Sequence, residues 1–175
     1  MSNDDIYFLN LAYQEAQLGL KEGGIPIGAV LVIDNVIIAK GYNKRIQEQS
    51  MIKHGEMDCL ENTKRQISPQ EMQRATLYTT LSPCYICAGA ILLNNISRVV
   101  IGENKSFEQS ESLLKEKGIE LVIVNDQKCI DMMLAFILDN PKLWGEDIGL
   151  TQQQVLNKYN KLFQYSTDRL LNEPI

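Results

Sequence analysis

Two separate stretches of this sequence contain residue types that bind zinc, and a fold in which both bind one ion must bring them close together. The first is residues 54–56 (HGE), and the second is residues 82–87 (SPCYIC). Zinc prefers imidazole and thiolate ligands, and a catalytic zinc site uses three protein ligands and leaves a fourth position to water. We therefore predict that His54, Cys84 and Cys87 bind one Zn²⁺ per chain, with Glu56 beside it as an acid and base.

The spacing of the two cysteines indicates the start of a helix. Residues three apart on a helix are neighbours, so Cys84 and Cys87 would present both sulfurs to one ion. Pro83 fits the first helical position, and the positive end of the helix would favour thiolates. A redox pair in a thioredoxin-like fold is the alternative, but it leaves the HGE stretch without a role. His54 is the only histidine of the chain, and we interpret it as a ligand rather than a surface or core residue.

Short apolar runs alternate with segments of helical periodicity along the chain. Apolar residues recur every three or four positions over residues 4–20, which predicts an amphipathic helix ended by Gly23 and Gly24. Two apolar runs, 29–33 and 36–39, flank Asp34 and Asn35 and predict a β-hairpin. Further strands are predicted at 76–81, 98–102 and 119–124, further helices at 54–64, 84–93, 110–117 and 126–138, and a polar surface connection at 68–74. This alternation predicts an α/β domain with helices on both faces of one sheet.

Composition and charge restrict the function further. The chain has 175 residues, about the size of one ordinary domain, and its 45% apolar content is typical of soluble globular proteins. The net charge of −5 provides no basic surface for phosphate, so we expect a small neutral substrate rather than a nucleic acid. No signal peptide and no apolar run of the ~20 residues of a membrane span is visible, which favours a reducing intracellular setting without membrane contact. We interpret Cys59 and Cys129 as buried core residues.

The two zinc-binding stretches match a known signature. His-x-Glu followed by Pro-Cys-x-x-Cys is the pattern of the zinc nucleoside and nucleobase deaminases. Over roughly the first 149 residues the chain resembles the fungal cytosine deaminases, through an ordered set of motifs at 22–28 (EGGIPIG), 41–45 (GYNKR), 54–56, 77–84 (LYTTLSPC), 102–104 with Phe107, and 144–149 (WGEDIG). The resemblance implies a cytidine deaminase-like fold, a three-layer αβα sandwich with a five-stranded mixed sheet.

Residues beyond this resemblance are predicted to form one extra C-terminal helix. We expect a deaminase domain at 1–149 and a helical extension of the same domain at 150–175. Thr151 would cap this helix, and its apolar positions are Val155, Tyr159, Leu162, Phe163 and Leu170. We expect the helix to pack on a dimer interface or near the entrance to the site.

The resemblance also implies how a pyrimidine is bound. Asn43 would hold the ring carbonyl and the adjacent ring N–H, together with the backbone N–H of Gly55. Phe107 and Trp144, in stretches typical of loops, would stack over the ring, although each could simply fill a core. Asp147 would accept hydrogen bonds from the exocyclic amine and repel a carbonyl oxygen, which would separate cytosine from uracil-like ligands.

Three further residues complete the implied pocket, and Glu56 supplies its chemistry. The pocket is lined by Leu81, by Ser82, whose backbone carbonyl would accept from the substrate amine, and by Ile27. The implied reaction is the hydrolytic deamination of free cytosine, and of 5-fluorocytosine, to uracil and ammonia in pyrimidine salvage. Glu56 would take a proton from the attacking water and pass it first to the ring nitrogen and then to the departing amine. A homodimer in the cytoplasm is implied, with the nucleus as a second location.

Other readings of the same signature remain open. A tRNA adenosine deaminase would share the zinc motif but would need basic residues for phosphate. Guanine deaminase is a closer rival, because it also acts on a free base. A non-catalytic, zinc-stabilised interaction domain would need a fourth protein ligand. Lys53, Asp58 and Gly145 depart from the resemblance, the first two by their charge and Gly145 by its small size, and we expect Gly145 to loosen the segment that contains Asp147.

Overall fold

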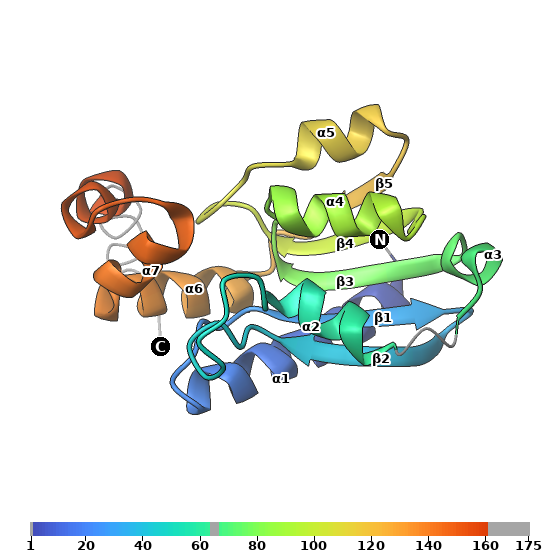
Figure 1. The fold of residues 1–175 in the computed structure, drawn as a ribbon, viewed down its shortest axis with the longest axis horizontal. Helices are drawn as coiled ribbons and strands as arrows, with labels where there is room; N and C mark the ends of the chain where they lie inside the picture. The colour runs from blue at the N-terminus through green and yellow to red at the C-terminus, as the bar shows by residue number, and fades with distance from the viewer. Residues whose placement is uncertain (1, 64–66, 161–175) are drawn as a thin grey trace, which may run out of the picture.

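The computed structural model describes residues 2–63 and 67–160, and these residues form one five-stranded mixed sheet of order β2-β1-β3-β4-β5 (Figure 1). The first strand is antiparallel to β2 and β3, while β3, β4 and β5 run parallel. The bounds are β1 (Gly28–Ile33), β2 (Val36–Tyr42), β3 (Ala75–Leu81), β4 (Arg98–Glu103) and β5 (Glu120–Ile123). The predicted strands and the predicted α/β sandwich are thereby confirmed.

Helices cover both faces of the sheet (Figure 1). Helices α1 (Asn3–Lys21) and α6 (Gln127–Asp139) pack on one face, and α2 (Gly55–Asn62), α4 (Tyr85–Leu93) and α5 (Glu111–Glu116) lie on the other. Every residue of β1 is buried, and its side chains alternate between two apolar clusters. Val30 and Val32 pack with Phe8 of α1, while Leu31 packs with Ile91 of α4. A strand that is buried on both faces, such as β1, therefore needs a continuous apolar run.

Local chemistry explains where the elements begin. Asp34 and Asn35 both have positive φ, 50° and 64°, which suits the two-residue turn of a hairpin. Ser2 and Asp5 form a reciprocal capping box at the start of α1. Asp126 caps α6 by accepting hydrogen bonds from two backbone N–H groups. These polar side chains set the boundaries within which the apolar faces are buried.

Three local predictions are wrong. Residues 68–74 are not a plain connection, because α3 (Pro69–Met72) begins there with a capping box at Ser68 and buries Met72. Pro83 is not at the first position of a helix, since α4 begins at Tyr85 with Cys84 as its N-cap. Trp144 is not in a loop but in α7 (Pro141–Ile148), a helix with proline at its N-terminus.

The chain continues past α7 in a second helical segment. Gly149 has a left-handed conformation, with φ 73°, and turns the chain back. Thr151 then forms a reciprocal pair of hydrogen bonds with Gln154, and residues 152–160 are helical. The predicted C-terminal helix is present over these residues, whereas Leu162, Phe163 and Leu170 lie outside the described residues. Figure 1 places α7 and this segment beyond the ends of β3 and β4. Within the described part of the chain, none of the helices is long and apolar enough to cross a lipid bilayer.

Candidate metal centre and substrate pocket

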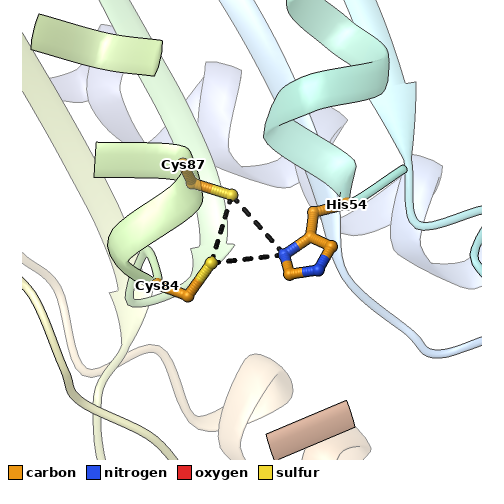
Figure 2. A group of neighbouring side chains, drawn as sticks. All are labelled: His54, Cys84 and Cys87. Atoms are coloured by element: carbon orange, nitrogen blue, oxygen red, sulfur yellow. Dashed lines mark hydrogen bonds between the residues drawn. The ribbon is translucent and has the colours of Figure 1, made fainter. Parts of the chain in front are cut away.

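The three predicted zinc ligands lie together where two helices begin. His54 is the N-cap of α2, Cys84 is the N-cap of α4, and Cys87 lies in the first turn of α4. Figure 2 shows the three side chains pointing toward one another, with Nδ1 of His54 3.3 Å from Sγ of Cys84 and 3.6 Å from Sγ of Cys87. The two sulfurs are 3.6 Å apart. Ligand atoms around a tetrahedral zinc with bonds of about 2.0–2.3 Å are separated by about 3.3–3.8 Å, so these three atoms fit one Zn²⁺.

The electrostatics of the cluster favour a thiolate. The hydrogen bond with Cys87, aided by His54, lowers the pKa of the Cys84 thiol to about 4, although burial opposes this. Burial disfavours a charged imidazole, but the hydrogen bond with Cys84 and the negative charges of Cys84 and Glu56 together outweigh it and raise the pKa of His54. The Cys84 thiolate is thus a ready-made ligand for a cation, and the His54 imidazole binds one once it has lost its proton.

Glu56 is a buried acid next to these ligands. Its side chain is in the first turn of α2, and Oε2 accepts a hydrogen bond from Sγ of Cys87 at 3.3 Å. Burial raises the pKa of Glu56, and the negative charge of Cys84 raises it further. A carboxylate with a raised pKa is a stronger base, which suits it to take up a proton from a water and pass it on.

Asn43 follows the end of β2 and is completely buried. Its backbone N–H donates to the carbonyl of Ile27 at 2.8 Å, and its Oδ1 accepts from the backbone N–H of Arg45 at 3.0 Å. Among the described residues its Nδ2 has no hydrogen-bond partner. A buried amide without a partner costs about 1–3 kcal/mol, so Asn43 offers a free donor to a ligand. Gly55 packs against the same carbonyl of Ile27, where a Cβ would come within 2.8 Å of the oxygen.

One pocket brings the metal cluster and most of the predicted substrate residues together. Its lining comprises Ile27, His54, Glu56, Leu81, Ser82, Cys84, Phe107, Trp144, Asp147 and Ile148. Asn43 and Gly55 are not among these residues but contact Ile27, which is. Phe107 and Trp144 meet edge to face, with ring centroids 6.0 Å apart and an interplanar angle of 82°. Trp144 also belongs to a buried apolar cluster, so it both fills a core and lines the pocket. Their roles toward a substrate stay predictions.

Asp147 is fixed by an ion pair that sequence reasoning missed. Nη1 of Arg45 contacts Oδ1 of Asp147, and both side chains are largely buried. Arg45 follows Asn43 closely in the chain, so one short segment approaches the pocket with an amide and a guanidinium. The signal was present in the motif at 41–45, because an acid that lines an apolar pocket needs a cation near it.

The zinc-binding region of the chain is also recognisable by comparison. Residues 2–103 match the family described as the cytidine and deoxycytidylate deaminase zinc-binding region. This chain belongs to the cytidine and deoxycytidylate deaminase family. The matched residues include the cluster of His54, Cys84 and Cys87, and the deaminase fold predicted from the sequence is confirmed.

Individual relatives of this deaminase differ in the substrate that their names give. A cytosine deaminase of Candida albicans is 48% identical over 150 residues, which cover 85% of this chain and 99% of that protein. A solved structure of a tRNA:A34 deaminase superposes with a TM-score of 0.58 at 26% identity, covering 68% of this chain and 98% of the other. A guanine deaminase structure from Bacillus subtilis has a TM-score of 0.51 at 28% identity, covering 69% and 72%.

Two of the three departures from the expected pattern lie in one cluster of charged side chains. Asp58 of the deaminase is buried, and Nζ of Lys53 lies 3.6 Å from its carboxylate. Lys44 is closer still, at 2.9 Å, and the backbone N–H of Tyr42 donates to the same carboxylate at 3.2 Å. Lys53 is itself closer to Glu61, at 2.9 Å, so the charges of Lys53 and Asp58 are balanced within one cluster beside α2.

The third departure, Gly145, does not loosen its segment. A Cβ at this position would come within 2.3 Å of the carbonyl oxygen of Leu150 and 3.2 Å of Val155. The backbone carbonyl of Gly145 also accepts from the N–H of Leu150 at 2.8 Å. The small residue is required because the chain after α7 packs tightly against it.

Two carboxylates, those of Glu111 and Glu103, hold the loop next to the pocket. Glu111 accepts hydrogen bonds at 3.0 Å from Oγ of Ser82 and from Nδ2 of Asn104. Glu103 accepts from the backbone N–H of Lys105 at 2.6 Å and of Ser106 at 3.0 Å, as well as from the Ser106 hydroxyl. These contacts fix the loop that bears Phe107. Nothing in the sequence indicated Glu111, because its partners are distant in the chain.

Proposed function

We propose that this deaminase hydrolyses free cytosine, and also 5-fluorocytosine, to uracil and ammonia. The observation that carries the proposal is one pocket in which the metal cluster, the buried Glu56 and the anionic acceptor Asp147 all take part. The Candida albicans relative, of which the match covers 99%, is named a cytosine deaminase. Such a relative supports a nucleobase as the substrate and pyrimidine salvage as the setting.

The chemistry divides between the metal and Glu56. When bound, Zn²⁺ lowers the pKa of a water from about 15.7 to roughly 7 and so supplies a nucleophile at neutral pH. Glu56 accepts the proton of the attacking water and delivers it to the ring nitrogen next to the amine-bearing carbon. The same carboxylate then takes the remaining proton from the added hydroxyl and gives it to the amine, which leaves as ammonia while the carbonyl of uracil forms. Burial of Glu56 suits this shuttle, since its raised pKa lets it hold the proton between the two transfers.

Binding of the base uses polar and aromatic groups of the pocket. The unpartnered Nδ2 of Asn43 donates to the pyrimidine carbonyl, and Asp147 accepts from the exocyclic amine. Arg45 holds Asp147 in its charged, acceptor-only form, which disfavours a carbonyl oxygen at the same place. Phe107 and Trp144 cover the ring and exclude water.

The closest rivals differ in the size and charge of the substrate. A tRNA substrate would need basic residues that follow a phosphate backbone, and the net charge of this chain is −5. No observation favours guanine over cytosine, and the relative named a guanine deaminase is 28% identical. A closed structural zinc site would need a fourth ligand, and the cluster found among the described residues provides His54, Cys84 and Cys87.

An ultraviolet assay of four compounds tests the proposal. Purified protein is incubated separately with cytosine, guanine, adenine and cytidine, and zinc per chain is measured on the same preparation. We expect one zinc per chain and conversion of cytosine alone. Conversion of guanine instead of cytosine, or zinc without conversion of any compound, would refute the substrate assignment.

We also propose that the chain is a homodimer, formed through the outer surface of α4 and the segment before α2. This surface exposes large apolar side chains, which are Met51, Ile52, Tyr85, Ile86 and Leu93. Contiguous apolar surface of this kind marks protein–protein contact sites. Leu93→Glu should convert a dimer to a monomer in sedimentation velocity, whereas Leu138→Glu on α6, an exposed leucine outside this surface, should not. Wild-type protein that sediments as a monomer would refute the proposal.

A location in the cytoplasm, with the nucleus as a second location, is likewise a proposal. All four cysteines of the chain are free thiols, and Cys59 and Cys129 are buried in the core, as predicted. Free thiols and a thiolate metal site both suit a reducing compartment. Fractionation of cells that express the protein at its natural level would test this location.

A further inference from the structure

We propose that Tyr159, in the helical segment after residue 149, is a positioning residue for the substrate pocket. This inference rests on the proposed function, because it concerns how the two aromatic residues over the base are held. Tyr159 is 1% exposed and lies beyond residues 144–149, the last of the motifs through which the chain resembles the fungal enzymes. The alignment with the Candida albicans relative covers 99% of that protein but 85% of this chain, so that relative has almost nothing to match the remainder.

The hydroxyl of Tyr159 joins the two segments that carry the pocket aromatics. It accepts a hydrogen bond from Nε1 of Trp144 at 3.0 Å. It also donates to the backbone carbonyl of Ser106 at 2.5 Å, and Ser106 directly precedes Phe107. A single buried hydroxyl thus connects α7 with the loop after β4, and it does so next to the edge-to-face contact of Phe107 and Trp144.

Ser106 is held from both sides. Its backbone N–H donates to Glu103 at 3.0 Å, and its carbonyl accepts from Tyr159. Glu103 belongs to β4, the strand that pairs with β3 beside the metal motif. The loop with Phe107 is therefore fixed to the sheet at one end and to the added helix at the other, which restricts where the Phe107 ring can lie.

The helix that contains Tyr159 is itself docked on α7. Val155, one turn earlier, is completely buried in the cluster that includes Trp144. Gly145 leaves the space that Leu150 and Val155 occupy, since a Cβ would come within 2.3 Å of the Leu150 carbonyl. Gly145 and the added helix are thus coupled. The helix fills the space beside α7 that a larger side chain at residue 145 would occupy.

Removal of the hydroxyl alone tests this role. Tyr159→Phe leaves the indole N–H and the Ser106 carbonyl without this partner, so Trp144 and Phe107 should lose their fixed orientation. We expect the KM for cytosine to rise about five-fold with kcat within about two-fold, because substrate and transition state lose the same stacking. Trp144 is the only tryptophan of the chain, so intrinsic fluorescence reports on it directly. Acrylamide quenching of this fluorescence should increase about two-fold as the indole gains freedom.

Tyr78→Phe is the matched control, because it also removes a buried tyrosine hydroxyl. The Tyr78 hydroxyl donates to Asp5 at 3.1 Å, within the cluster formed by α1. Tyr78→Phe should lower the Tm without changing the KM for cytosine or the quenching of Trp144 fluorescence. If Tyr159→Phe behaves like this control, Tyr159 is an ordinary core residue and the proposal is wrong. Should Tyr159→Phe fail to fold, Val155→Ala, which loosens the docked helix, must raise both KM and quenching, and unchanged values would equally overturn the proposal.

The two proposals fail in different ways. A wild-type protein that converts no base would refute the cytosine assignment. The difference in Trp144 quenching between the Tyr159 and Tyr78 variants needs no turnover and would still decide the positioning role.

Discussion

The pocket has two walls that are built differently. The metal wall contains His54, Glu56, Cys84 and Cys87, which come from two stretches of at most four residues at helix N-termini. The aromatic wall contains Phe107, Trp144 and Asp147, which come from a loop and α7 and are fixed by partners in two other segments, Arg45 and Tyr159. The metal ligands are thus held by local motifs, whereas the residues predicted to select the substrate are held by long-range contacts. The walls should therefore respond differently to substitution.

Loss of a ligand from the metal wall should have the largest effect. Cys84→Ala leaves two of the three ligands, so we expect most of the zinc to be lost and turnover to fall by roughly 10³-fold or more. Zinc content and cytosine turnover measure this. Cys129→Ala, a buried cysteine outside the cluster, should keep its zinc. A Cys84 variant that keeps one zinc per chain would contradict this account, because metal binding would then not depend on the motif.

Replacement of Asp147, the hydrogen-bond acceptor of the aromatic wall, should have the next largest effect. Asp147→Asn leaves Arg45 unpaired and places an amide, which can donate, where an acceptor is required. We expect kcat/KM for cytosine to fall about 100-fold, that is about 2.7 kcal/mol, and inhibition by uracil to strengthen. Zinc content should not change. Asp34→Asn, which removes an exposed partner of Arg74, is the control and should leave both values unchanged. Weaker inhibition by uracil in the Asp147 variant would contradict the assigned selectivity.

A substitution far from both walls separates stability from function. Asp5 is buried, and Arg98 donates to it at 2.7 and 3.1 Å, which holds the pKa of Asp5 well below its usual range. Asp5→Asn should lower the free energy of unfolding at pH 7 by about 3 kcal/mol, measured in urea. The KM for cytosine should not change, and a changed KM would mean that the pocket depends on global stability.

The pH dependence of the Asp5 effect has a definite sign. The folded-state pKa lies below the unfolded value of about 3.9, so the unfolded chain binds more protons in this range. The stabilisation is complete above about pH 4 and is lost as the pH falls through the folded-state pKa. The difference between wild type and Asp5→Asn should therefore shrink below about pH 4 and stay constant above it. A difference that grew on acidification would contradict the ion pair.

The contrast between the walls also explains what could be predicted from the sequence. The metal wall was predictable because its residues are close in the chain and their types dictate zinc chemistry. The strands were predictable from apolar runs buried on both faces. The position of Pro83 was predicted wrongly, because a cysteine can serve as an N-cap and this moves the helix start to Tyr85. The division of the chain at residue 149 stays a prediction.

The aromatic wall was predicted only as a set of residues. Trp144 was assigned to a loop, although Pro141 at the start of α7 is a residue that helices favour there. The pairing of Arg45 with Asp147 and of Tyr159 with Trp144 depends on how distant segments pack, and no local pattern records it. Gly145 was interpreted as a source of looseness, whereas its neighbours show that it is a packing requirement.

Glu56→Gln tests the central claim most directly, with zinc content and cytosine turnover measured on the same preparation. Glutamine keeps the size of the side chain but cannot take up the proton, so we expect one zinc per chain and turnover reduced by roughly 10²- to 10⁴-fold. Glu61→Gln, an exposed position on the same helix α2, serves as the control and should behave like the wild type. Near-normal turnover of cytosine by the Glu56 variant would contradict the proton shuttle and with it the proposed mechanism.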